Sequence, residues 1–316
     1  NIDDKIIIKA RENGVQPMDL AKNFEKEYLQ DMKRLGITSV KKYARATDYI
    51  PKIISQVKRL VEKGYAYKLD DGIYFETGKL ASYGKLGGLT PLSESQARIE
   101  TTKKSPRDFV LWKLSQDDHI GFESPWGKGF PGWHIECSVM SRELLGQPFD
   151  IHTGGVDHIP VHHNNEIAQS EAAYDTPLAN FWLHNEFVNV ADGKMAKSEG
   201  TSITLKALTN NGFSPLAYRY FLLMAHYRKP VFFTPEALKA AQNAYTKITK
   251  LVSSWPETGR VDEAYKAQFK EKIENDLNTA QALAVLWTLV KDKEVSPENK
   301  LATLLDFDKV LGLGLK

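Results

Sequence analysis

The sequence has a single cysteine, Cys137, among its 316 residues, so it cannot form an internal disulfide. It also lacks an apolar run long enough to cross a membrane as a helix, and it has no secretory signal pattern at its start. These absences exclude a disulfide-stapled scaffold and an integral membrane protein. We therefore expect a protein of the cytoplasm.

A strong charge of either sign is absent as well. The chain has 42 lysines and arginines against 40 aspartates and glutamates, which gives a formal net charge of +2. Such a balance excludes a general polyanion-binding surface, so an RNA partner would have to be held by local patches. The length leaves room for about two domains, each able to bury a core.

The first segment that indicates chemistry is Lys194-Met195-Ala196-Lys197-Ser198. The residues before it predict a strand at 187–190 and a turn at 191–193, which places both lysines on a mobile loop. Two ammonium groups on such a loop can neutralise charge that develops on a leaving pyrophosphate. The alternative is a pair of solvated lysines, the commonest interpretation of such a run.

A second constellation combines Cys137, His162 and Glu166. The segment around residues 162–172 predicts a helix, in which positions 162 and 166 share one face as an i,i+4 pair. Thiolate, imidazole and carboxylate form a three-ligand zinc site with one position open to a ligand. The alternative is that Cys137 is a small buried hydrophobe and that the other two are ordinary first-turn residues of the helix.

Four longer motifs connect these segments to a known family. They are P-G-W-H-I-E-C-S at 131–138, F-D-I-H-T-G-G-V-D at 149–157, H-H-N-N-E-I-A-Q-S-E at 162–171 and A-H-Y-R-K-P at 225–230. In this order, and with the lysine segment standing where the family has K-M-S-K-S, they resemble cysteinyl-tRNA synthetase, a class I aminoacyl-tRNA synthetase. The resemblance extends over almost the whole chain.

The resemblance implies an α/β fold. A Rossmann-like catalytic domain would occupy residues 1–230, with a connective insertion at about 65–126 and the lysine loop at 194–198, and an α-helical bundle would follow at 231–316. The family's first half carries an H-I-G-H signature and a further zinc-binding cysteine, and neither occurs here. We therefore expect the chain to begin in mid-domain.

The resemblance also implies the substrates and the residues that meet them. The reaction would activate L-cysteine with Mg²⁺-bound ATP and transfer it to tRNA(Cys), with one Zn²⁺ per chain, in a monomer. The implied roles are catalysis by Lys194 and Lys197, ATP binding by Lys194, Met195, Lys197 and Ser198, cysteine binding by Trp133, His152 and Asp157, and zinc binding by Cys137, His162 and Glu166.

Structural alternatives stay open for the three cysteine-pocket residues. Trp133 suits a core position, His152 a hydrogen-bonded strand end, and Asp157 a turn or helix cap. The chain also departs from the family at Ala196, where a serine hydroxyl is lost, and at Thr153, which adds a Cβ in place of the first glycine of a triplet. Asn164 replaces a glutamate beside the expected metal.

Two other functions compete with the synthetase. The nearer is the related ligase that joins cysteine to an amino-sugar in mycothiol synthesis, because it shares the cysteinyl-adenylate chemistry. The motif at 167–171 and the helical tail favour the synthetase over this ligase. The other is a catalytically inert synthetase-like fragment that only binds RNA or a partner protein.

Hydrophobic periodicity predicts the remaining elements. Helices are expected at 18–35 and 50–63, the second with Pro51 in its first turn and Gly64 at its end, and a β-hairpin is expected around Asp71-Gly72. The expected helices of the tail are at 214–228, 235–253, 261–282, 282–292 and 301–311.

Overall fold

The computed structural model describes residues 4–88, 103–115, 121–190, 193–194, 203–257 and 259–315. The chain forms two compact units. The first contains Asn1–Lys22 and Lys42–His184, and the second contains Asn23–Lys41 and Asn185–Lys316. Within the described residues, no helix combines the length and the hydrophobicity needed to cross a bilayer. The boundary expected at residue 230, between the catalytic domain and the helical bundle, stays a prediction.

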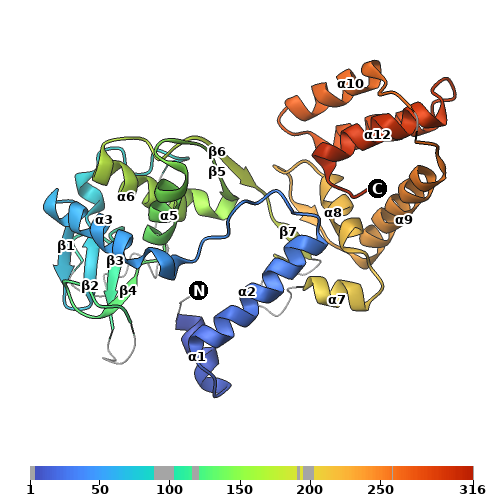
Figure 1. Ribbon diagram of the computed structural model, residues 1–316. Helices are drawn as coiled ribbons and strands as arrows, with labels where there is room; N and C mark the ends of the chain where they lie inside the picture. The colour runs from blue at the N-terminus through green and yellow to red at the C-terminus, as the bar shows by residue number, and fades with distance from the viewer. Residues whose placement is uncertain are drawn as a thin grey trace. The chain divides into compact units, whose positions relative to one another are not determined.

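The first unit combines a small antiparallel sheet with helices and a second pair of strands (Figure 1). The sheet has the order β1-β2-β3-β4, and a separate two-stranded sheet pairs β5 with β6. The elements are α1 (Asp4–Glu12), α2 (Pro17–Arg34, shared with the second unit), η1 (Ala46–Tyr49), α3 (Ile50–Glu62), β1 (Ala66–Leu69), β2 (Gly72–Phe75), η2 (Thr77–Lys79), β3 (Phe109–Leu114), β4 (Gly129–Pro131), α5 (Ile135–Leu145), β5 (Phe149–Gly155), η3 (Val156–His158), η4 (Ile159–His163), α6 (Asn164–Tyr174) and β6 (Ala179–Asn185).

Local sequence signals account for much of this unit. The hairpin predicted around Asp71-Gly72 is confirmed by the antiparallel pairing of β1 with β2. Helix α3 confirms the expected helix: Pro51 lies in its first turn and Gly64, with φ +78°, follows its end. Ile53, Val57 and Leu60 are fully buried on its inner face, whereas Val61 is 37% exposed.

The core of the first unit lies between α3, α5, α6 and the four-stranded sheet. Trp112 of β3 and Phe75 of β2 are completely buried there, together with Ile135 at the start of α5. Each large side chain buried in this way contributes about 1.5–3 kcal/mol relative to exposure. The sheet thus provides a rigid base against which the start of α5 is packed.

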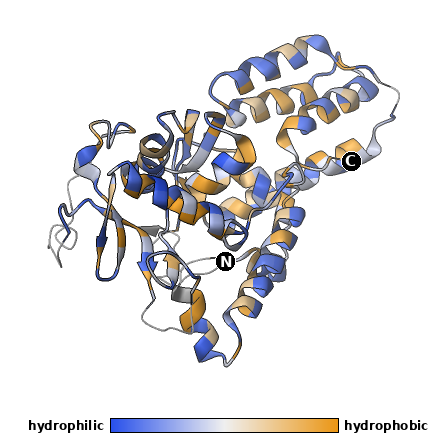
Figure 2. Cartoon of the chain, turned by 60° about the vertical axis from the view of Figure 1, so that its left-hand side comes forward, coloured by the Kyte–Doolittle hydropathy of each residue, from blue (hydrophilic) through white to orange (hydrophobic). Residues whose placement is uncertain are grey.

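The second unit is mainly helical. Its elements are β7 (Val188–Val190), β8 (Gly193–Lys194), α7 (Leu205–Asn210), α8 (Pro215–Leu223), β9 (Val231–Phe232), α9 (Pro235–Ser254), α10 (Glu263–Glu274), α11 (Thr279–Lys291) and α12 (Pro297–Leu311). The helices carry hydrophobic and hydrophilic residues together, as amphipathic helices of a bundle do (Figure 2). Leu286, Leu304 and Phe307 are buried in their common core.

Two expected helices are corrected by the structure. The boundary expected at residue 282 between two helices lies earlier, between Glu274 of α10 and Thr279 of α11, because Asp276 and Leu277 both adopt a left-handed conformation with φ 54° and Asn278 caps the start of α11. The helix expected at 214–228 ends at Leu223. The expected helices at 18–35, 235–253, 282–292 and 301–311 are present, with bounds that differ by a few residues.

Candidate metal and substrate site

Cys137 lies in the first turn of α5, which begins immediately after the sheet. Gly132 precedes this helix and packs so closely on β3 that an added Cβ would come within 2.1 Å of the Val110 carbonyl oxygen. The backbone N–H of Gly132 donates to the carbonyl of Leu111 at 2.9 Å. Because these contacts fix the entry to the helix, they also fix where the thiol of Cys137 lies.

His162 and Glu166 lie across the junction between the π-helical turn η4 and helix α6. Their Nε2 and Oε1 atoms are 3.0 Å apart. The i,i+4 pair on one helix face, predicted from spacing, is confirmed. Glu166 is only 1% exposed because α6 is enclosed on almost all sides.

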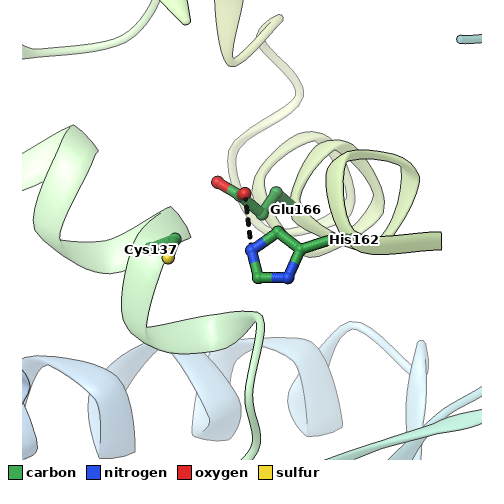
Figure 3. Close-up of side chains that lie close together, drawn as sticks. All are labelled: Cys137, His162 and Glu166. Atoms are coloured by element: carbon green, nitrogen blue, oxygen red, sulfur yellow. Dashed lines mark ion pairs between the residues drawn. The ribbon is translucent and has the colours of Figure 1, made fainter. Parts of the chain in front are cut away.

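The structure brings all three predicted metal ligands together. One sulfur, one nitrogen and one oxygen, from Cys137, His162 and Glu166, lie within 4.8 Å of one another. Figure 3 shows Cys137 on α5 facing the side of the helix that carries the other two side chains. Two segments that are well separated in sequence thus meet at one point in the first unit.

Further histidines surround this point, and the sequence interpretation assigned them no role in binding metal. His152, His163 and Glu166 form a second group whose ligand atoms also lie within 4.8 Å of one another. The Nδ1 atoms of His134 and His162 are 3.0 Å apart, and His163 Nδ1 is 2.8 Å from His184 Nε2. His134 and His163 stand within the recognised motifs, so their place in those motifs was the available signal.

The electrostatics of the cluster follow from burial and close charges. Burial alone raises the pKa of Glu166, but the adjacent imidazoles of His152 and His162 outweigh it and lower the pKa to about 2. Burial lowers the pKa of His134 and of His163 to about 3. Burial and the neighbouring carboxylates raise the pKa of the Cys137 thiol. At neutral pH the cluster therefore combines an anionic Glu166 carboxylate with neutral rings at His134 and His163.

One observation in particular indicates that these residues suit a bound metal ion. Glu166 Oε2 is buried and makes no hydrogen bond within the described part of the chain, although His152 Nε2 approaches it to 3.4 Å. A buried ionised oxygen without a hydrogen bond is costly unless a cation pairs with it. A bound cation would also stabilise the thiolate form of Cys137. A donor set of one sulfur, one nitrogen and one oxygen is typical of zinc.

The three residues expected to bind cysteine have different surroundings. Trp133 is 62% exposed, so its alternative as a core residue is wrong. His152 is half-buried on β5, with its ring 4.6 Å from that of Trp182. Asp157 is exposed in η3. Its Oδ1 atom lies close to the backbone of Gly155, because a Cβ added to Gly155 would be 2.4 Å from that oxygen.

Gly154, Thr153 and Asn164 lie beside the proposed site, and each has a distinct environment. A Cβ at Gly154 would lie 2.7 Å from His158 Nδ1 and 2.7 Å from His163 Cε1, so this position needs a residue without one. Thr153, which replaces the family's first glycine, is exposed on β5. Asn164, the other departure, donates from its side-chain amide to the carbonyl oxygens of Leu86 and Ile159.

The lysine segment lies in the second unit, and the structure describes only its first residue. The backbone of Lys194 belongs to strand β8, which pairs antiparallel with β7, so the expectation that Lys194 lies on a loop is wrong. The strand expected at 187–190 is present as β7. Met195, Ala196, Lys197 and Ser198 lie outside the described residues.

Comparisons with known protein families match nearly the whole chain. The model of the tRNA synthetases class I (C) catalytic domain matches residues 1–243, and that of the DALR domain matches residues 268–316. The first alone covers more than half of the chain.

Curated relatives point to the same family. A cysteine–tRNA ligase 1 of Burkholderia lata is 43% identical over 99% of this chain and 68% of its own length. The cysteine–tRNA ligase of Trichodesmium erythraeum is 39% identical over 100% of this chain and 73% of its own length. The cysteine–tRNA ligase of Caldicellulosiruptor saccharolyticus is 41% identical over 92% of this chain and 66% of its own length. The chain thus spans about two thirds of the length of these relatives.

A solved structure shows the same fold at low identity. Methionyl-tRNA synthetase of Mycobacterium tuberculosis, in complex with methionyl-adenylate, aligns with a TM-score of 0.61 and 16% identity over 98% of this chain and 80% of its own. The fold class expected from the sequence is thereby confirmed. By its family models and its relatives, the chain belongs to the cysteinyl-tRNA synthetases of class I.

Proposed function

We propose that this chain carries the metal and amino-acid site of a cysteine–tRNA ligase. The observation that carries the proposal is the convergence of Cys137, His162 and Glu166, with a buried carboxylate oxygen that lacks a hydrogen bond. The names of the curated relatives support the same activity.

The ligand set supports zinc in particular, at one ion per chain. When bound, Zn²⁺ supplies a borderline-soft centre that prefers the thiolate of cysteine to the nearly isosteric hydroxyl of serine. Discrimination of this kind exceeds what a hydrophobic pocket provides for an isosteric pair. Cys137, His162 and Glu166 would hold the ion.

The remaining residues would bind and orient the substrates. We assign Trp133, His152 and Asp157 to cysteine, with the Asp157 carboxylate suited to the ammonium group. We assign Lys194 and Lys197, with Met195 and Ser198, to ATP, whose β- and γ-phosphates carry Mg²⁺. The cysteine carboxylate attacks the α-phosphorus, cysteinyl-adenylate forms and pyrophosphate leaves. The terminal ribose hydroxyl of tRNA(Cys) then takes the cysteinyl group and AMP leaves. We expect a cytoplasmic monomer.

The test is ATP–pyrophosphate exchange by the complete protein. Exchange should require cysteine and should not be supported by serine at the same concentration. Preformed adenylate is then offered either tRNA(Cys) or an amino-sugar, and transfer to tRNA is expected. Transfer to the amino-sugar instead would support the alternative ligase. Absence of exchange with every amino acid would support the inert alternative and contradict the proposal.

A further inference from the structure

The second ring nitrogen of His162 has a specific partner. His162 Nε2 faces Glu166, while its Nδ1 lies on the opposite side of the ring, as Figure 3 shows. That Nδ1 is 3.0 Å from Nδ1 of His134, an ordinary distance for an N–H···N hydrogen bond. The two rings meet nearly edge to face, with centroids 4.5 Å apart and an angle of 77° between their planes.

His134 is held where it can act on His162. It directly precedes α5, and its carbonyl oxygen accepts hydrogen bonds from the backbone N–H and the hydroxyl of Ser138. Its ring also packs edge-on against Phe109, with centroids 5.8 Å apart. The residue that directly precedes helix α5 therefore reaches His162, while the helix itself presents Cys137 three residues later.

From this geometry we infer that His134 is a positioning residue for the metal site, which fixes the tautomer and the ring orientation of His162. The inference rests on the proposed binding of metal by Cys137, His162 and Glu166. A neutral imidazole carries one ring hydrogen, and metal binding through Nε2 requires a lone pair there, so the hydrogen is on Nδ1. His134 Nδ1 then accepts it, and the hydrogen of His134 is on its own Nε2.

The arrangement has a physical consequence for affinity. A metal-binding histidine usually donates its other N–H to a second group, and loss of that group typically weakens metal binding by about 10–100-fold. In this protein the acceptor is another histidine. An apolar side chain at position 134 would leave the Nδ1–H of His162, whose side chain is 13% exposed, without this partner. Its loss favours the wrong tautomer and frees the ring to rotate.

Two substitutions separate hydrogen bonding from packing. His134→Phe keeps a ring against Phe109 but removes the acceptor. His134→Asn loses the ring but keeps an acceptor, because Asn Oδ1 is the same number of bonds from Cβ as His Nδ1. His226→Phe and His226→Asn serve as matched controls, since His226 lies in the second unit beside Asp276, at 3.7 Å.

The measurement is the zinc affinity of the complete protein, by competition with a chromogenic chelator. His134→Phe should weaken zinc binding by about 10–100-fold, His134→Asn should stay within about threefold of the original protein, and both controls should be unchanged. Equal zinc affinity for His134→Phe and the original protein would overturn the inference. Equal losses in both His134 variants would also overturn it, because they would indicate packing alone. If the original protein binds no zinc, the proposed metal site itself fails, which is a separate result.

A second measurement does not depend on how the variants fold. In the zinc-loaded original protein, ¹⁵N NMR of the histidine rings should show His162 with its hydrogen on Nδ1 and His134 with its hydrogen on Nε2. A hydrogen on Nδ1 of His134 in that state would contradict the inference, because His134 could then not accept from His162.

Discussion

Gly154→Ala should strain the histidine cluster without altering any expected ligand. The new Cβ would lie 2.7 Å from His158 Nδ1, 2.7 Å from His163 Cε1 and 2.8 Å from His163 Nε2. Ordinary contacts of this kind are about 3.5–4.0 Å, so the rings must move by roughly 0.8–1.3 Å. The His163 side chain is 1% exposed and its Nδ1 is hydrogen-bonded to His184 Nε2, so the ring has little room to move. We expect a loss of about 1–3 kcal/mol in the free energy of unfolding, as for other overpacked sites.

The assay is urea unfolding, with Gly78→Ala as the matched control. A Cβ at Gly78 would have nothing within 4 Å, so the control should lie within about 0.5 kcal/mol of the original protein. Gly154→Ala should also bind zinc about tenfold more weakly, because His163 Nε2 lies 4.0 Å from Glu166 Oε1 and displacement of the His163 ring changes the surroundings of this carboxylate. Equal stability and equal zinc affinity for the two variants would refute this reasoning.

Three further substitutions test separate parts of the account. Cys137→Ser should release zinc and weaken cysteine binding far more than ATP binding, which elemental analysis and equilibrium dialysis would show; unchanged zinc content would exclude Cys137 as a ligand. Lys197→Ala should lower cysteine-dependent pyrophosphate exchange by roughly a hundredfold, and near-normal exchange would place Lys197 among solvated lysines. Asp276→Asn tests linkage to pH. Hydrogen bonds from Arg228 and Tyr227 lower the pKa of Asp276 below its ordinary 3.8, so the carboxylate stabilises the fold above that pH and loses this effect as pH falls through its folded pKa. At pH 7 the free energy of unfolding should be lower for Asp276→Asn than for the original protein, and this difference should be smaller at pH 3. A larger difference at pH 3 would contradict the stabilising role assigned to the Asp276 carboxylate.

Some features of the structure were predictable because they depend on residues only a few positions apart in the sequence. Spacing placed His162 and Glu166 on one face, and Asp71-Gly72 predicted the hairpin. The break between α10 and α11 was predicted too late in the sequence, at residue 282, because the apolar periodicity continues across its true position. The signal was present in Asn278, a favoured helix-capping residue, but it competes with that periodicity.

Contacts between distant segments could not be predicted from spacing. Arg219 donates to the carbonyls of Leu35 and Leu311, which ties the segment Asn23–Lys41 to the end of α12 inside the second unit. No periodicity in the sequence encodes that contact. The pairing of His134 with His162 is of the same kind, since the two rings come from different elements and meet only once α5 and α6 pack together.

The sequence therefore predicted that the three proposed ligands would come together, but it did not predict their surroundings. Cys137, His162 and Glu166 came from motif and spacing, whereas the shell of His134, His163 and His184 depends on tertiary packing. The orphaned oxygen of Glu166 is also a property of burial, which the sequence pattern does not specify.

The most direct test of the central claim is X-ray absorption at the zinc edge of the complete protein, recorded alone, with cysteine and with serine. We expect zinc with sulfur, nitrogen and oxygen neighbours, and we expect the number of sulfur neighbours to rise by one with cysteine and to stay unchanged with serine. A sulfur count that is the same in all three spectra would contradict the proposal that a zinc ion in this protein selects cysteine over serine.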